Sequence, residues 1–234
     1  MTPLILFLAV VACIAGWWLS HQRLTAKPWL EEGLADHLSG AGAVSVPASK
    51  IGLGVFFAVA GCLFTLLISA YFMRMGMGDW RPLPMPKLLW INTGVLIASS
   101  AGLQWTQVSA QHGQIGDVRA GLLVSGIAAI GFLTGQLEAW QELSGAGYFL
   151  ASNPANSFFY LLTGIHGAHL LGGLVALGRT SAKAWRDPPA GDLGLSVQLC
   201  CWYWHFLLVV WLVVFAVLMQ WADGLVVICR SLLT

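Results

Sequence analysis

Charge is what this sequence has least of. Asp, Glu, Lys and Arg together make up 9% of its 234 residues, and the formal net charge is +1. A soluble domain carries roughly 25% charged residues, so this chain lacks the groups that cover a water-facing surface. The small net charge provides no basic face for nucleic acid and no acidic face for a basic partner. A soluble fold and a nucleic-acid partner are therefore both excluded.

Cysteine is also sparse and follows no metal-binding or disulfide pattern. The five cysteines are Cys13, Cys62, Cys200, Cys201 and Cys229, an odd number without a CxxC spacing. Most lie in apolar runs, where cysteine behaves as a small hydrophobic residue. The sequence also lacks a phosphate-binding glycine loop and a nucleophile–base motif. These patterns predict no disulfide framework, no metal site and no catalytic residue.

Long apolar runs are what the sequence does contain. Hydrophobic residues make up 58% of the chain, and a helix that crosses the bilayer core needs roughly 20 of them in succession. We therefore expect an all-α, polytopic membrane bundle of about six transmembrane helices. The runs that qualify cover residues 3–19, 51–73, 88–110, 119–141, 156–178 and 198–222.

The first run is expected to stay in the protein as a membrane anchor. It has no basic residue before it, no small-residue cleavage pattern, and a Trp17-Trp18 pair at its end, unlike a signal peptide. With the N-terminus outside, more basic residues fall in the inner loops than outside, which favours an N-out, C-out topology. The inner set is Arg23, Lys27, Lys50, Arg119, Arg179, Lys183 and Arg186, and the outer set is Arg74, Arg81, Lys87 and Arg230.

Three histidines are notable because ionisable residues inside a span are costly and are functional candidates by default. His166 and His169 are three positions apart, on one helical face, and His205 lies in the last run. Imidazoles on two helices could ligate haem, which would make the chain a cytochrome b-like membrane anchor. The other interpretation is that each imidazole forms a hydrogen bond to a neighbouring helix, which is the commoner use of such residues.

A small transporter is a further alternative. Transporters often contain spans interrupted by Gly and Pro in matching halves, and no such pair of interruptions occurs here. The middle of the expected spans is also poor in charge, which argues against ion translocation through this chain alone.

Four motifs resemble, in order, those of subunit III of the cytochrome c oxidases. The segment 157–169 has an aromatic pair followed by T-G-x-H-G-x-H, and this motif and the one in the last run are the specific ones. The other matching residues are Leu88–Thr93 with Ala98–Ser100, then Gln136, Trp140 and Glu142, and finally Trp202–Phe206 with Val209–Leu212. Together they cover roughly residues 80–222.

The resemblance implies a non-catalytic integral membrane subunit of a proton-pumping haem–copper terminal oxidase in a bacterial inner membrane. Haem and copper are then expected in partner subunits, with no cofactor or metal in this chain. The implied partners are oxidase subunits I and II, a small subunit IV and bound phospholipid, with cytochrome c as the substrate of the complex. The chain would divide into an N-terminal helix and loop, 1–50, and a five-helix core, 51–234.

The candidate site residues are structural, and all are polar or aromatic residues within the spans or at their ends. Tryptophan, present 12 times, suits interfacial belts and lipid contacts, and basic residues suit anionic headgroups. The residues expected to contact lipid or another subunit are Trp80, Arg81, Asn92, Gln136, Trp140, His166, His169, Arg179, Trp202, Trp204 and His205.

The sequence departs from the pattern of the family in three places. Well-studied members carry a glutamate in the middle of the helix that corresponds to 51–73, where this chain reads Val59-Ala60-Gly61-Cys62-Leu63. Many members have Asp where this chain has Leu208. One helix, rather than two, is expected before the five-helix core. No role that depends on the missing glutamate is assigned to this chain.

Overall fold

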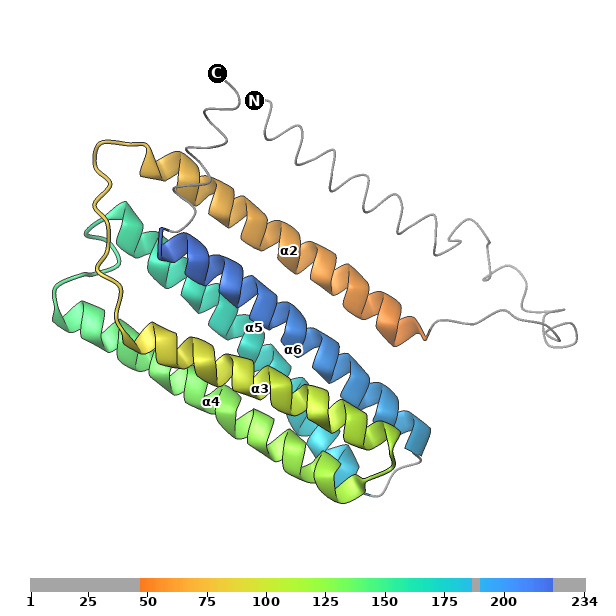
Figure 1. Ribbon diagram of the computed structural model, residues 1–234. Coiled ribbons are helices and arrows are strands. Elements are labelled where there is room, and N and C mark those ends of the chain that lie inside the picture. Colours follow the sequence, from red (N-terminus) through yellow and green to blue (C-terminus); the bar gives the residue numbers. More distant parts are fainter. Residues whose placement is uncertain (1–46, 187–189, 221–234) are drawn as a thin grey trace, which may run out of the picture. The chain divides into compact units, whose positions relative to one another are not determined.

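A computed structural model describes residues 47–186 and 190–220 of the protein (Figure 1). The chain divides into two units, Met1–Val46 and Pro47–Thr234, and the described residues belong to the second. They form five helices and no strand. The helices are α2 (Ala48–Met75), α3 (Leu88–Gln111), α4 (Ile115–Gly145), α5 (Pro154–Trp185) and α6 (Ala190–Leu218).

Helices α3, α4, α5 and α6 form a ring in which each helix packs against the next and α6 packs back against α3. Helix α2 lies outside this ring, against α5 and α6 (Figure 1). Consecutive helices run in opposite directions, as short connections require. One end of the bundle, called here the Pro154 end, holds the starts of α3 and α5; the opposite end is called the Trp185 end.

At the Pro154 end, Asn153 caps the start of α5. Asn153 precedes α5 with an extended backbone, and its side-chain oxygen accepts a hydrogen bond from the Ala155 amide at 3.3 Å, as an N-cap does. Its side-chain nitrogen donates to the carbonyl oxygen of Arg81. Asn153 therefore connects the α2–α3 loop to the start of α5.

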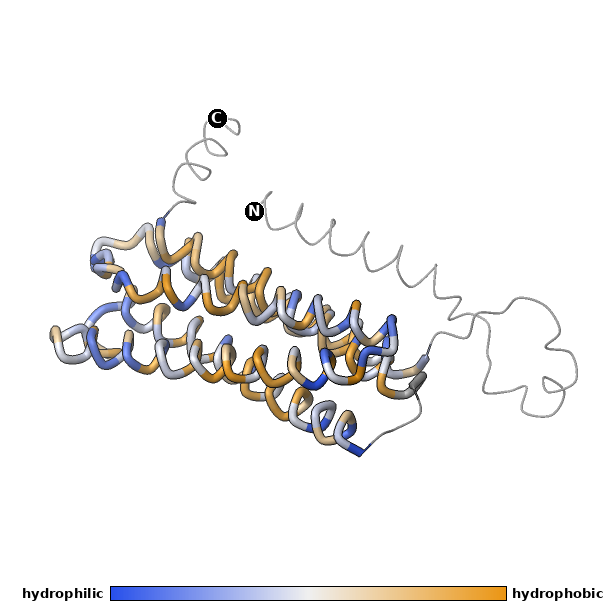
Figure 2. Tube along the Cα trace, turned by 60° about the horizontal axis from the view of Figure 1, so that its bottom comes forward, coloured by the Kyte–Doolittle hydropathy of each residue, from blue (hydrophilic) through white to orange (hydrophobic). Residues whose placement is uncertain are grey.

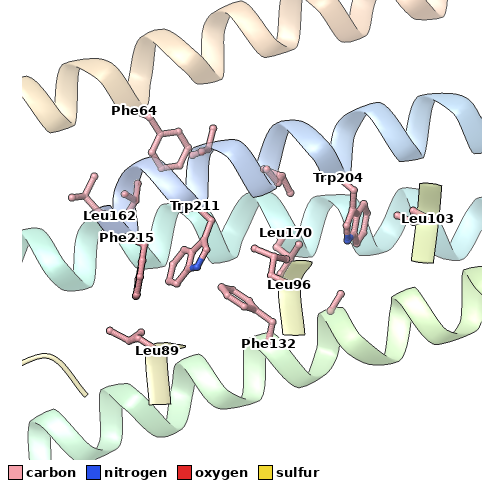
Figure 3. Close-up of a cluster of buried hydrophobic side chains, with 14 of the residues drawn as sticks. Phe64, Leu89, Leu96, Leu103, Phe132, Leu162, Leu170, Trp204, Trp211 and Phe215 are labelled. Carbon is pink, nitrogen blue, oxygen red and sulfur yellow. The ribbon is translucent and has the colours of Figure 1, made fainter. Parts of the chain in front are cut away.

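Large aromatic side chains fill the centre of the ring. Figure 3 shows Phe132 of α4 and Trp211 of α6 pointing toward each other, with ring centroids 4.8 Å apart and planes at 90°. This edge-to-face arrangement suits the charge distribution of aromatic rings. Both residues are fully buried, as are Trp204, Leu96 and Leu103. The ring of four helices therefore has a solid core.

Four of the five helices, α2, α4, α5 and α6, are long and apolar enough to cross a membrane. Figure 2 shows hydrophobic residues along the helices and hydrophilic residues gathered at their ends and turns. Helix α3 is not among these four, and it carries a series of buried polar residues: Asn92, Thr93, Ser99, Ser100, Thr106 and Ser109. The expected number of about six transmembrane helices is not confirmed, and the run 3–19 lies outside the described residues.

Candidate functional site

The three histidines do not converge on one point. His166 Nε2 donates to the carbonyl oxygen of Leu207 in α6 at 3.2 Å, and His169 Nδ1 donates to Ile165 of its own helix at 2.8 Å. His205 is held by α3, as described below. Within the described ranges, no group of three His, Cys, Asp or Glu side chains is arranged to hold a metal ion. The histidines therefore act as hydrogen-bonding groups of the bundle.

His166 is the most enclosed of the three. Its side chain is fully buried, with the rings of Phe132 and Trp211 at centroid distances of 5.5 Å and 4.9 Å. Its Nδ1 has no hydrogen-bond partner among the described residues. The imidazole thus joins α5 to α6 at the aromatic centre of the ring.

Side-chain hydrogen bonds connect α3 and α6 along their contact. The indole nitrogens of Trp211 and Trp204 donate to the hydroxyls of Thr93 at 3.0 Å and Ser99 at 2.9 Å. At the next residue of each helix, the Ser100 hydroxyl contacts His205 Nδ1. A tryptophan N–H inside a membrane bundle needs such an acceptor because no water is present to supply one. Polar groups of α3 therefore serve as acceptors for aromatic residues of α6.

His205 also has a partner at the edge of the same boundary. Its Nε2 donates to the side-chain oxygen of Gln104 in α3 at 2.9 Å. Both nitrogens of the ring are thus engaged by α3. Gln104, Ser99, Ser100 and Thr93 were not among the residues expected from the sequence, and the run of small hydroxyl residues in an otherwise apolar helix was the available signal.

Helix α2 is attached to the ring by aromatic contacts. Phe57 stacks on Phe206 with centroids 4.4 Å apart and planes at 15°, while Phe56 and Phe64 lie 5.8 Å and 5.6 Å from the His169 ring. The Tyr203 hydroxyl donates to the backbone oxygen of His169 at 2.7 Å. The ring of His169 therefore serves the α2 contact, which its spacing from His166 did not indicate.

The α4–α5 pair carries two further expected residues. Trp140 Nε1 donates to the Thr163 hydroxyl at 3.1 Å, and Gln136, one turn before Trp140, is 96% buried. Asn92 of α3 packs against Gly135, where the position of a Cβ would lie 2.2 Å from the Asn92 side-chain oxygen. Glycine at 135 therefore lets α3 and α4 approach closely. Gln136 and Trp140 are both residues that line a surface groove.

The remaining expected residues lie near the two ends. Trp80 packs edge-on against Tyr71, 4.9 Å away, and Arg81 is held through its backbone by Asn153. At the other end, Trp202 is 41% exposed and lies under the Lys50 ammonium at 5.3 Å, and Arg179 is exposed. Trp80 and Arg81 lie beyond the end of α2, where an interfacial belt is expected.

Arg119 lies near the start of α4, and the sequence suggested no role for it beyond its contribution to the membrane orientation of the chain. Its Nε donates to the backbone oxygen of Ala184 at 3.1 Å, and its guanidinium lies over the Trp185 ring at 5.8 Å. Arginine can satisfy the last carbonyls of a helix and stack on an aromatic face at once. Arg119 therefore ties the start of α4 to the end of α5.

Replacing His166 with Leu is expected to cost about 0.6–2 kcal/mol of stability, the range for one interhelical hydrogen bond in a membrane bundle. His169→Leu is the matched control, because the His169 ring donates within α5 and its loss removes ring contacts with α2 but no hydrogen bond between helices. Thermal unfolding of the purified membrane complex measures both. A larger loss for His169→Leu than for His166→Leu would contradict this assignment.

The chain matches a family model described as "Cytochrome c oxidase subunit III" over residues 47–223. A "Probable cytochrome c oxidase subunit 3" from Mycobacterium tuberculosis is 31% identical over 178 residues, covering 72% of this chain and 86% of the relative. A "Probable cytochrome c oxidase subunit 3" from Nocardia farcinica is 30% identical over 176 residues, covering 71% of this chain and 85% of the relative. A "Cytochrome c oxidase subunit 3" from Thermostichus vulcanus is 30% identical over 177 residues, covering 72% of this chain and 85% of the relative.

Proposed function

The chain belongs to the cytochrome c oxidase subunit III family, and on this premise we propose that it is the non-catalytic subunit III of a proton-pumping haem–copper terminal oxidase. Its role is to stabilise the catalytic subunit through many turnovers and to bind structural phospholipid. It contacts oxidase subunits I and II and a small subunit IV in a bacterial inner membrane, N-out and C-out. Electrons pass from cytochrome c to oxygen in the partner subunits.

The use of the histidines within the bundle is the observation that supports this role. His166, His169 and His205 each donate to a neighbouring protein oxygen. A bis-histidine haem site needs imidazoles that face each other across helices, whereas these rings serve three different contacts. The arrangement suits a scaffold more than the alternative of a haem-binding anchor.

The apolar outer faces support a subunit that works inside a larger membrane assembly. Val59 of α2, Ile127 of α4 and Val175 of α5 are each more than half exposed, whereas the polar groups of α3 are turned inward. Such surfaces fit hydrocarbon or the helices of another subunit. Val59 belongs to the stretch of α2 where well-studied family members carry a glutamate, and helix α2 itself has no Asp or Glu between Ala48 and Met75.

Purification of the tagged chain from its native membrane tests the proposal. Haem-containing subunits and oxidase activity are expected to elute with it. Removal of the chain is expected to reduce the number of turnovers that the oxidase completes before it is inactivated. Supplying cytochrome c or quinol in the same assay identifies the electron donor.

The chain expressed alone is the control for that experiment. It is expected to show no Soret band and no bound iron or copper. A Soret band with stoichiometric iron would instead support the haem-binding anchor, and substrate flux into proteoliposomes holding only this chain would support the transporter.

A further inference from the structure

Gln104 of α3 presents a polar side chain to the outside of the bundle. The asparagine, serine and threonine side chains of α3 are buried, whereas Gln104 is exposed. Helix α3 packs against α4 and α6, and the other described helices leave its remaining side uncovered. An exposed amide on the outer face of a membrane helix is costly unless it finds a hydrogen-bond partner.

The oxygen of this amide is already used inside the protein. Gln104 Oε1 accepts from His205 Nε2 at 2.9 Å and from the Cys201 thiol at 3.3 Å. The Ser100 hydroxyl contacts His205 Nδ1. Because a neutral imidazole has one donor and one acceptor nitrogen, Nδ1 accepts from Ser100 and Nε2 donates to Gln104. Both lone pairs of Oε1 are therefore occupied, which fixes the orientation of the amide.

The nitrogen of the amide is left without a partner. Within residues 47–186 and 190–220, no group accepts a hydrogen bond from Gln104 Nε2. This nitrogen carries two N–H donors, on the other side of the amide from the oxygen that α6 holds. The amide cannot turn toward an interface without breaking the bonds to α6. The missing acceptor must therefore approach α3 from outside the bundle.

The depth of Gln104 excludes lipid esters and bulk water as that acceptor. The apolar span of α6 is Leu193–Leu218, and its middle lies close to Trp204, whose indole donates to Ser99 of α3. Gln104 is five positions from Ser99, about 8 Å along the axis toward the Trp185 end. Half of a bilayer core is about 15 Å, so Gln104 lies about 7 Å inside the hydrocarbon. Water is absent at this depth, and the esters of phospholipids lie at the boundary.

The outer face of α3 has the length and character of a contact between membrane helices. Trp90, Ile97, Trp105 and Val108 lie along it, and each is at least 40% exposed. Trp90 and Val108 are 18 positions apart, about 27 Å along the axis, which matches the roughly 30 Å of a bilayer core. A partner helix that crosses the membrane can therefore follow α3 over the whole span.

Small residues at the centre of this face allow a close approach. Gly94, Ala98 and Ala101 are exposed and lie three or four positions apart, so they share one side of α3. Nothing lies within 4 Å of the Cβ position of Gly94. Small residues let two membrane helices approach until polar groups meet, and Ala101 lies about one turn before Gln104.

A second copy of this chain is a poor source of the acceptor. In a symmetric pair the same residues face each other across a two-fold axis, so each Gln104 nitrogen would need the Gln104 oxygen of the other copy. That oxygen already accepts from His205 and Cys201 and has no further lone pair. The acceptor therefore belongs to a different chain.

We propose that the outer face of α3, from Trp90 to Val108, docks a transmembrane helix of a partner subunit, and that Gln104 Nε2 donates a hydrogen bond to an oxygen of that helix. The partner helix carries a hydroxyl, amide or carboxyl side chain about 8 Å from the middle of the bilayer, toward the Trp185 end. The inference rests on the proposed function in taking the partner subunit from the oxidase complex.

The first test identifies what covers α3 in the native membrane. The photoreactive residue p-benzoylphenylalanine is placed at Ala101 of the tagged full-length chain, and mass spectrometry identifies the cross-linked peptide after irradiation. We expect a cross-link to an apolar segment of a subunit that co-purifies with the chain. The same residue at Ala176, exposed on α5, is the control and is not expected to give that product. Adducts with lipid alone, with a second copy of this chain, or identical from both positions would overturn the proposal.

A second measurement isolates the hydrogen bond of Gln104. Gln104→Leu is expected to raise the rate at which the partner subunit is lost in detergent about three- to tenfold. His205→Leu is the matched control, because it removes the internal bond to Gln104 and leaves the amide in place, so a smaller increase is expected. No increase in Gln104→Leu, or an equal increase in both variants, would show that Gln104 does not bond to the partner.

The outcomes also separate the docking face from the proposed function. Absence of haem-containing subunits from the preparation would reject the oxidase role, while a cross-link from Ala101 to another membrane chain would still support the docking face. Haem-containing subunits that co-purify without any cross-link from Ala101 to a protein would support the oxidase role and overturn the docking face.

Discussion

Replacing Trp211 with Ala is expected to lower the free energy of unfolding by about 3–5 kcal/mol. The indole is fully buried, contacts Phe132 and His166, and donates to the Thr93 hydroxyl. In a membrane the loss comes from the cavity, the missing dispersion contacts and the hydrogen bond that Thr93 no longer accepts, because lipid offers an apolar solvent to the unfolded helices as well. Thermal or denaturant unfolding of the purified complex measures the change.

Two other substitutions show which part of Trp211 matters. Trp211→Phe keeps an aromatic ring and loses the N–H donor, so we expect a loss of about 1 kcal/mol. Trp202→Ala removes a tryptophan of the same helix that is 41% exposed, and a change under about 1 kcal/mol is expected. If Trp202→Ala proved as costly as Trp211→Ala, burial in the ring would not explain the effect.

Replacing Gly173 with Ala is expected to destabilise the protein by about 1–3 kcal/mol, although one methyl group is added. The new Cβ would lie 2.6 Å from Tyr203 Cε1 and 2.9 Å from Trp204 Cζ3. Both rings are anchored, since Tyr203 donates to His169 and Trp204 to Ser99. They can make room only by breaking those bonds or by separating α5 from α6.

Gly172 is the matched control for this substitution. It precedes Gly173 on the same helix, is exposed, and its Cβ position meets nothing closer than the Tyr203 hydroxyl at 3.9 Å. Gly172→Ala is expected to leave stability unchanged or to raise it by up to about 1 kcal/mol through helix propensity. Thermal unfolding of the two variants is compared, and equal effects would contradict the close contact between α5 and α6.

Hydropathy located the helices but underestimated their lengths. The runs 119–141 and 156–178 became Ile115–Gly145 and Pro154–Trp185, and 51–73 became Ala48–Met75. Hydropathy detects only the part of a helix that lies in hydrocarbon, whereas the hydrogen bonds of the helix continue into the interface. The ends depend on residues such as Asn153, whose capping role follows from its place before Pro154.

The motifs around His166 and His205 predicted the family, and the comparisons confirm it. They did not predict that Ser99 would accept from Trp204, or Thr93 from Trp211, residues more than 100 positions apart. Nor did they show that Gln136 would line a groove without a hydrogen-bond partner in the described bundle.

By itself, the sequence determined that this chain is helical and lies in a membrane. Each charged side chain and each unpaired backbone group carries its own free-energy cost in lipid, so the preference can be read from single residues. Which face of each helix turns inward, and which polar groups meet, was decided by the tertiary structure. Those pairings depend on the rotation and axial register of helices distant in the chain, which close packing at residues such as Gly135 and Gly173 sets.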